Sequence, residues 1–298
     1  MRETTVQEYE AAIHRALMRA LEDPNCCPAD LADAAGFSAF HFSRMFAGMV
    51  GESPGELLKR LRLERAALSL KARQRVTEVA FDAGYESLEA FSRAFRNAFG
   101  CSPSQFATTN HVACLPAPSS LHMTPDGSPC LIVLPHLHRG KKSMNVEIQE
   151  SIVPQRVIAI RHIGPYNQIG PVFQKLVVWA GANNVSMVGP GLAIFHDDPE
   201  SVSSEQLRSD ACIPVVADFT STDPDVQAID LPGGRYAVAT HTGSYAGLGD
   251  AWSQFIGKWI PTSGEHIDFE RPCYEVYLND CSVVSEEQLL TQLYEPIR

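Results

Sequence analysis

The sequence has no long apolar run and no surplus of positive charge. No apolar stretch reaches the about 18 residues that a membrane-spanning helix requires, and the opening segment RETTVQEYEAAIHRAL alternates charged and apolar residues at helical spacing. The formal net charge is −11, which argues against a protein that simply coats nucleic acid. We therefore expect a cytoplasmic protein that makes no use of the membrane.

The eight cysteines lack the paired spacing of a metal or redox site. No Cys-x-x-Cys occurs among them, and in a chain of this size without an export signal we expect small buried hydrophobic residues. His136 and His138 beside Arg139 have no further ligands close by in the sequence. The sequence therefore indicates neither a metal site nor a cofactor.

Acidic residues are concentrated in the second part of the chain. Residues 1–110 hold 13 Lys and Arg against 14 Asp and Glu, whereas residues 111–298 hold 11 against 21. The segment that begins at Thr108, TTNHVACLPAPSSLHMTPDGSP, is rich in Pro, Ser and Thr and has no helical periodicity. We predict a first domain over 1–108, a linker over 109–143 and a second domain over 144–298.

The first domain contains a repeat. HFSRMFAGMVGESP at 41–54 and AFSRAFRNAFGCSP at 90–103 share Phe-Ser-Arg-x-Phe followed by Gly-x-Ser-Pro. Each copy reads as a short helix, a glycine turn and a helix of about eleven residues, which is the anatomy of a helix-turn-helix. The paired phenylalanines predict a buried face, and the opposite face, with Ser and Arg in each copy, predicts contact with DNA.

A helix is predicted between the two copies. Ser53-Pro54-Gly55-Glu56 supplies an N-cap, a proline at the first helical position and a capping Glu, and the helix should run to about Lys71. Its length of roughly 27 Å suits two reading helices about one DNA turn apart. The segment from Lys59 to Arg75 carries seven basic residues. It predicts phosphate contacts, Arg60 among them, with a solvated helix face as the alternative.

The segments LADAAGFSAFHFSRMFAGMVGESPGELLKRLRLERA and VTEVAFDAGYESLEAFSRAFRNAFGCSPSQF resemble the AraC/XylS-type DNA-binding domain over about residues 7–107. The resemblance implies that the first reading helix places Phe40, His41, Ser43 and Arg44 in one major groove. It implies that the second places Leu88, Glu89, Ser92, Arg93 and Arg96 in the next. Leu88 and Glu89 depart from the family, which often has amide side chains there.

The acidic part also repeats itself. VIAIRHIGPYNQIGPVFQKLVVWA and YAVATHTGSYAGLGDAWSQFIGKWI align at an offset of 79 and share His-x-Gly-x-Tyr. Each copy predicts a strand, a turn and a helix, followed by further strands, and helices on one sheet make an α+β domain. His162 and His241 are interpreted as core histidines without a catalytic role.

Glu275 lies in RPCYEVYLND, which reads as a strand with Cys273, Glu275 and Tyr277 on one face. One interpretation is that Glu275 faces water at a sheet edge. The other is an apolar pocket, where an unpaired carboxylate is costly unless a cation joins it. Aromatic walls would strengthen such cation binding.

GPYNQIGPVFQKL, GLAIFHDDPE, LPGGRYAVATHTGSY and CYEVYLND resemble the GyrI-like effector-binding domain over about residues 145–298. The resemblance implies two pseudo-symmetric βαββ halves around a ligand cleft with a central Glu, which is Glu275 here. It implies that the aromatic walls are Tyr166, Phe195, Tyr245 and Trp252.

The expected molecule is multidomain, with an all-α double helix-turn-helix domain followed by an α+β domain. We predict a one-component transcription regulator that binds promoter DNA and senses a small lipophilic effector, cationic or neutral. By resemblance it more often activates transcription through RNA polymerase. The alternatives, a hydrolase that uses Glu275 with Tyr277 and a protein-binding module, are less favoured, and we predict that the protein is not an enzyme.

Overall fold

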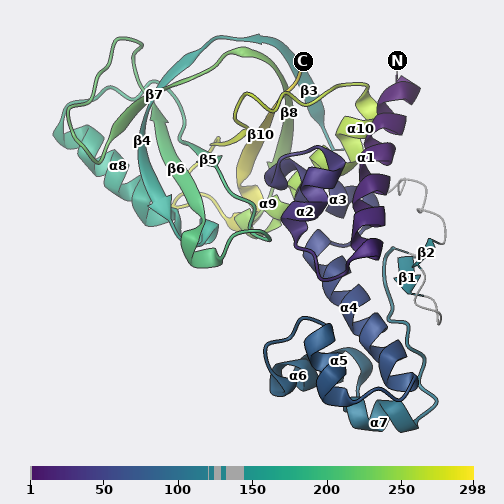
Figure 1. Ribbon diagram of the computed structural model, residues 1–298. Helices are drawn as coiled ribbons and strands as arrows, with labels where there is room; N and C mark the ends of the chain where they lie inside the picture. Colours follow the sequence, from purple (N-terminus) through teal and green to yellow (C-terminus); the bar gives the residue numbers. More distant parts are fainter. Residues whose placement is uncertain (1, 120, 124–128, 132–143) are drawn as a thin grey trace.

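The computed structural model describes residues 2–119, 121–123, 129–131 and 144–298 (Figure 1). Part of the predicted linker, including His136 and His138, lies outside these residues. The first part of the chain is helical. Its elements are α1 (Arg2–Glu22), α2 (Pro28–Ala35), α3 (Ala39–Val50), α4 (Pro54–Lys71), α5 (Val76–Asp82), α6 (Leu88–Phe99) and α7 (Pro103–Thr108). A small antiparallel pair, β1 (Leu121–Met123) and β2 (Pro129–Leu131), follows.

The sequence repeat corresponds to two helix-turn-helix units, α2 with α3 and α5 with α6, and this prediction is confirmed. Gly51 and Gly100 end the second helix of each unit in the left-handed conformation, with φ of 88° and 74°. Ser53 and Ser102 then cap the following helices. The repeated Gly-x-Ser-Pro is therefore a helix stop followed at once by a helix start.

The two units have separate hydrophobic cores. The second unit packs Phe91, Phe95 and Phe106 with the end of α4. The core of the first unit, which includes Phe42 and Phe46, continues into the C-terminal domain. Figure 1 shows α4 carrying the second unit away from the rest of the molecule, while α3 lies beside α9.

The C-terminal domain is one eight-stranded antiparallel sheet made from two similar halves. The first half comprises β3 (Val146–Ile152), β4 (Gln155–Ile163), α8 (Gly170–Ala182), β5 (Leu192–Phe195) and β6 (Arg208–Pro214). The second comprises β7 (Gln227–Leu231), β8 (Gly234–Thr242), α9 (Leu248–Gln254), β9 (Tyr274–Tyr277) and β10 (Leu290–Pro296). The order β3-β8-β10-β9-β5-β6-β4-β7 shows that the halves exchange their first strands and join at β9 and β5.

The predicted pseudo-symmetry is visible in the turns that follow β4 and β8. His162 Nε2 lies 3.0 Å from the carbonyl oxygen of Pro165, and His241 Nε2 lies 3.2 Å from that of Ser244. Each histidine thus contacts the turn that follows its own strand. The sequence placed both histidines in the core, whereas the structure leaves them half-buried near the ends of their strands.

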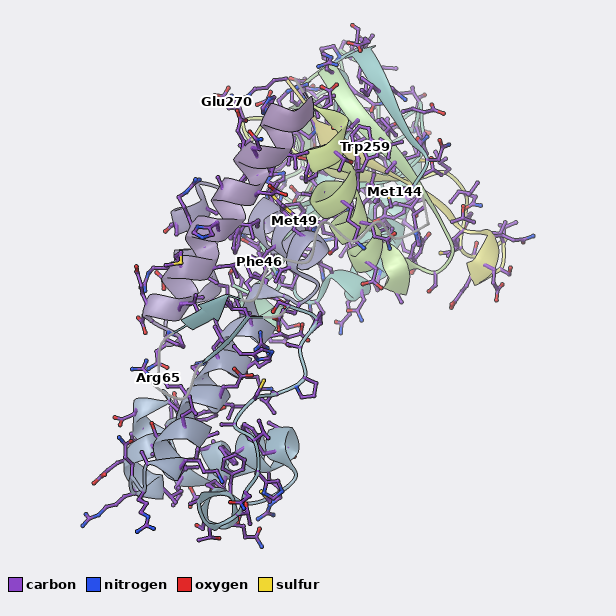
Figure 2. The ribbon with its side chains drawn as sticks, turned by 90° about the vertical axis from the view of Figure 1, so that its right-hand side faces the viewer. Phe46, Met49, Arg65, Met144, Trp259 and Glu270 are labelled. Carbon is purple, nitrogen blue, oxygen red and sulfur yellow. The ribbon has the colours of Figure 1, made fainter. Side chains whose placement is uncertain are left out.

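The helices of the two halves have different neighbours. The helix α8 covers the sheet near β4 and β6. The helix α9 continues into a π-helical turn, η4 (Phe255–Trp259), and α10 (Ile260–Ser263), and these elements pack on α3 and α1. Figure 2 shows Phe46 and Met49 at this junction, with Met144 and Trp259 on the side of the C-terminal domain.

The seven cysteines whose side chains the structure describes are free thiols, and they differ in burial. Cys26, Cys212 and Cys273 are buried, as expected for small hydrophobic residues. The expectation is wrong for Cys27, Cys114 and Cys281, which are exposed. Cys27 precedes α2 and Cys281 lies in a turn, so neither is in a position that packs against a core.

Candidate ligand site and nucleic-acid interface

Glu275 lies in the interior of the sheet. Strand β9 is flanked by β10 and β5, with Leu293 and Ala193 opposite Glu275, and only 4% of the residue is exposed. Trp252 Nε1 donates a hydrogen bond of 2.7 Å to one carboxylate oxygen, and the Tyr277 hydroxyl donates one of 3.0 Å to the other. The structure therefore rules out the interpretation that Glu275 faces water at a sheet edge.

Burial raises the pKa of Glu275, because a charged carboxylate loses its hydration. The hydrogen bonds from Trp252 and Tyr277 and the positive charge of Arg44 act in the opposite direction. Burial and the neighbouring Glu275 raise the pKa of the Tyr277 hydroxyl, so it remains a donor. Both donors are neutral, so neither cancels the negative charge that the carboxylate carries when it is ionised.

The predicted aromatic residues form two groups. Trp252 bonds Glu275, and the Tyr245 ring lies 5.5 Å from that of Tyr277. Tyr166 and Phe195 make a second pair, with ring centroids 4.8 Å apart. The Tyr166 hydroxyl donates to the carbonyl oxygen of Asp197, and burial raises its pKa to about 12.

Arg44 reaches this site from the first helix-turn-helix unit. Its guanidinium carbon lies 3.5 Å from the Phe40 ring centroid and 5.9 Å from that of Trp252. Nη1 donates to the carbonyl oxygen of Phe40, whereas Nε is shut off from solvent and has no partner in the described part of the chain. Burial lowers the pKa of Arg44, whereas nearby groups that include Asp198 and Glu275 act to raise it.

The other predicted base-reading residues of α3 also face the C-terminal domain. Phe40, His41 and Ser43 are 7%, 7% and 8% exposed. Ser43 Oγ donates to Asp198 at 2.7 Å, and His41 Nε2 lies 3.0 Å from a Glu295 oxygen. Because α3 packs on α9 and η4, its reading face is inaccessible to DNA in this arrangement. The sequence contains no local signal for this contact.

A cavity of about 550 Å³ opens beside Arg44, between the first unit and the C-terminal domain. Arg44 and Ser43 line it from α3, and Asp198, Glu200 and Asp250 line it from the other side. Lys258 is the basic residue that lines it besides Arg44. The carboxylates favour a positively charged occupant.

The geometry can be compared with known proteins. A model of the GyrI-like small molecule binding domain matches residues 144–298, and a helix-turn-helix domain model matches residues 31–109. The chain belongs to the GyrI-like family. Its DNA-binding and small-molecule-binding domains are those of a ligand-sensing transcription regulator, and this agrees with the two resemblances found in the sequence.

Among similar proteins is the DNA gyrase inhibitor of Erwinia billingiae, 32% identical over 157 residues, which covers 52% of this chain and 97% of that protein. The C-terminal domain of EcmrR is 17% identical with a TM-score of 0.44, over 52% of this chain and 98% of the other. SAV2435, solved bound to tetraphenylphosphonium, is 13% identical with a TM-score of 0.37, over 52% and 94%.

The second helix-turn-helix unit points away from the GyrI-like domain, as Figure 1 shows. Leu88, Glu89, Arg93 and Arg96 on α6 are exposed, and Ser92 is half-buried. The predicted residues of this reading helix therefore form one accessible face. The two units differ in what covers them and not in their local structure.

The predicted phosphate contact at Arg60 is wrong. Arg60 is 7% exposed, and its Nη2 lies 2.7 Å from a Glu52 oxygen, with Glu64 on the other side at 3.3 Å. Lys71 also turns inward, to the carbonyl oxygen of Phe106. The exposed basic residues of this segment are Lys59, Arg65, Arg73 and Arg75.

Two groups of three potential metal ligands occur in the described residues. In one, Glu64 lies with Cys114 and His122, and its carboxylate already accepts from Arg60 and from the backbone of Leu115. The other joins His41, Cys273 and Glu295 across the junction. Burial raises the pKa of the Cys273 thiol well above its usual value, which disfavours the thiolate that metals bind.

None of the helices in the described part of the chain combines the length and the apolar character that crossing a bilayer requires.

Proposed function

We propose that this protein is a one-component transcription regulator. Residues 1–108 bind promoter DNA, residues 109–143 link the domains, and residues 144–298 bind a small lipophilic cation. The buried carboxylate of Glu275, held by Trp252 and Tyr277 among aromatic rings, is the observation that carries this proposal. A helix-turn-helix domain in the same chain supports a regulatory use of that site.

The cation is the ligand class that fits Glu275 best. A neutral lipophilic ligand would be attracted by the aromatic rings alone, whereas a cation adds attraction to the carboxylate in a site with little water. Acidic side chains around the neighbouring cavity, Asp198, Glu200 and Asp250, attract the same class. Tyr166, Phe195, Tyr245 and Trp252 supply apolar surface for the body of the ligand.

DNA is read by both helix-turn-helix units in this proposal. Ser92, Arg93 and Arg96, with Leu88 and Glu89, would enter one major groove. Phe40, His41, Ser43 and Arg44 would enter the next after α3 leaves the GyrI-like domain. The bound regulator activates transcription through contact with RNA polymerase in the cytoplasm. Neither alternative from the sequence, a Glu-dependent hydrolase or a protein-binding module, gains a specific observation in the described residues.

The ligand class is tested by removing one charge. Tetraphenylphosphonium and the neutral triphenylphosphine oxide are titrated into the wild type and Glu275→Gln by calorimetry. The substitution should weaken phosphonium binding at least several-fold and change binding of the neutral compound little, because the shape of the site is preserved. Glu270→Gln, an exposed carboxylate five residues away, is the matched control and should bind as the wild type does. Equal phosphonium affinities for the wild type and Glu275→Gln would contradict the role of Glu275.

A further inference from the structure

The residues predicted to read DNA from α3 are the same residues that contact the ligand-binding domain. We infer that Arg44 is an internal occupant of the cation site, and that a cationic ligand displaces it and thereby releases α3 to bind DNA. In the docked arrangement, meaning α3 packed on α9 and η4, the first unit is masked. This inference rests on the proposed function and adds the mechanism by which the ligand and DNA are coupled.

Arg44 has the chemistry of a substitute ligand. Its guanidinium carries one positive charge, stacks on Phe40, lies within reach of the Trp252 ring and is attracted by Glu275. Trp252 is also the donor that holds Glu275. The Trp252 indole therefore lies beside both the Arg44 guanidinium and the Glu275 carboxylate. A ligand cation that approaches Glu275 would meet Arg44 at this indole.

Arg44 can be replaced because it is poorly satisfied in this position. Its Nε is shut off from solvent without a hydrogen-bond partner in the described residues, and a buried donor without a partner is costly. A lipophilic cation such as a phosphonium has no N–H groups to satisfy. It gains the same attraction to Glu275 at a smaller desolvation cost than the guanidinium.

The cavity gives a ligand access to Arg44. Arg44 and Ser43 form part of its wall, and Ser43 is bonded to Asp198 on the opposite side. A volume of about 550 Å³ is within the range of small-molecule pockets, roughly 300–1,000 Å³. A ligand that enters here meets Arg44. Its entry separates α3 from the loop of Asp198 and Glu200, to which Ser43 is hydrogen-bonded.

The docked arrangement depends on close contact between two glycines. A Cβ built on Gly257 would lie 2.5 Å from Gly48 Cα, 2.9 Å from the Met45 oxygen and 3.0 Å from the Arg44 oxygen. All three are backbone atoms, so no side-chain rotation relieves the clash. Because Gly257 lies in η4 of the GyrI-like domain, Gly257→Ala opens the junction without altering either reading helix.

Release of α3 should raise DNA affinity because the second unit is exposed already. In the docked arrangement one reading helix is available, and after release two are available on one rigid connection through α4. The second contact then becomes intramolecular, which multiplies affinity without any change in the first contact.

The experiment measures the anisotropy of a labelled duplex, selected from a random library by the full-length protein. Tetraphenylphosphonium should raise the DNA affinity of the wild type at least tenfold. Gly257→Ala should bind DNA about as tightly without the phosphonium, and adding it should change little. Gly181→Ala, in α8 with no atom within 4 Å of the added methyl group, is the control and should behave as the wild type does. DNA should in turn raise phosphonium affinity by the same factor.

A second variant covers the case in which Gly257→Ala does not fold. Asp198→Ala with Glu200→Ala removes the side chains that accept from Ser43 Oγ and from the backbone of Gly55. It should raise DNA affinity and speed hydrogen exchange over residues 39–50, whereas Glu205→Ala, an exposed residue of the same loop, should change neither. If the wild type binds both ligands and neither the phosphonium nor these variants change DNA affinity, the inference is overturned and the proposed function stands. Failure to bind phosphonium or any duplex overturns the proposed function and the inference with it.

Discussion

Arg60→Met should destabilise the protein, although sequence analysis places Arg60 on a DNA-binding surface. Its guanidinium contacts Glu52 through Nε at 3.1 Å and Nη2 at 2.7 Å, and donates to the Leu121 carbonyl oxygen at 2.7 Å. Burial alone would lower the pKa of Arg60, but the hydrogen bonds and charges of Glu52 and Glu64 raise it. The ion pairs therefore outweigh the loss of hydration.

The magnitude follows from what the substitution leaves behind. Glu52 is 8% exposed and Glu64 is fully buried, so Met at position 60 removes the guanidinium from two buried carboxylates. Glu64 keeps its contacts with His122 Nδ1 at 2.9 Å and with the Leu115 N–H, so Glu52 bears the greater loss. Breaking a buried pair by removing one partner costs about 3–5 kcal/mol. We expect a loss of this size in the free energy of unfolding. The variant Arg60→Met/Glu52→Gln/Glu64→Gln should recover most of it, because the two side chains that lose the guanidinium are then neutral.

Urea denaturation followed by circular dichroism measures this loss. Arg65→Met is the matched control, since Arg65 lies on the same helix and is exposed (Figure 2), and it should change stability by no more than about 0.5 kcal/mol. An Arg60→Met loss below about 1 kcal/mol, together with weaker binding to every duplex, would refute this reasoning. Arg60 would then be hydrated and available to phosphate.

Three further predictions concern the second unit and the cation site. Arg93→Ala should weaken binding to the selected duplex by about 1–3 kcal/mol, and equal losses on selected and random duplexes in anisotropy would assign Arg93 to phosphate instead. Phosphonium affinity should fall as the pH is lowered, and should do so at a higher pH than an ordinary carboxylate would give, because Glu275 has a raised pKa and loses its charge on protonation; Glu275→Gln should show no such fall in calorimetry. A flat wild-type profile would remove Glu275 from the site. Phe95→Ala should destabilise the second unit by about 3–5 kcal/mol, with faster hydrogen exchange in α5–α7 and at the end of α4. Faster exchange in α1–α3 would show that the cores are not separate.

Local features of the sequence were sufficient to predict much of the fold. Helix starts and stops at Gly51, Ser53, Gly100 and Ser102 depend on capping groups within a few residues. The start at Ser53 was predicted from these local groups, and the structure has it there. The phenylalanines at i and i+4 are also a local signal, because this spacing places them on one face of a helix, and that face is buried in each unit. The repeated His-x-Gly-x-Tyr predicted two similar halves. This local signal was sufficient because each histidine contacts the turn that follows its own strand.

The exchange of first strands between the halves could not be read in this way. Strand β3 pairs with β8 and β7 pairs with β4, and alternation along a strand is the same whichever strand lies beside it. The sequence predicted two halves, and only the tertiary structure decided how they are joined.

Arg44 and Arg93 show the limit most clearly, because they occupy equivalent positions in the repeat. Local sequence determined that both stand on the outer face of a helix-turn-helix unit. The tertiary structure decided that Arg93 faces solvent and that Arg44 lies on Trp252 near Glu275, residues more than 200 positions away in the chain. Periodicity records which side of a helix is apolar enough to be buried. It does not record what a long cationic side chain on the other side will meet, since that depends on shape and charge contributed by the opposite end of the sequence.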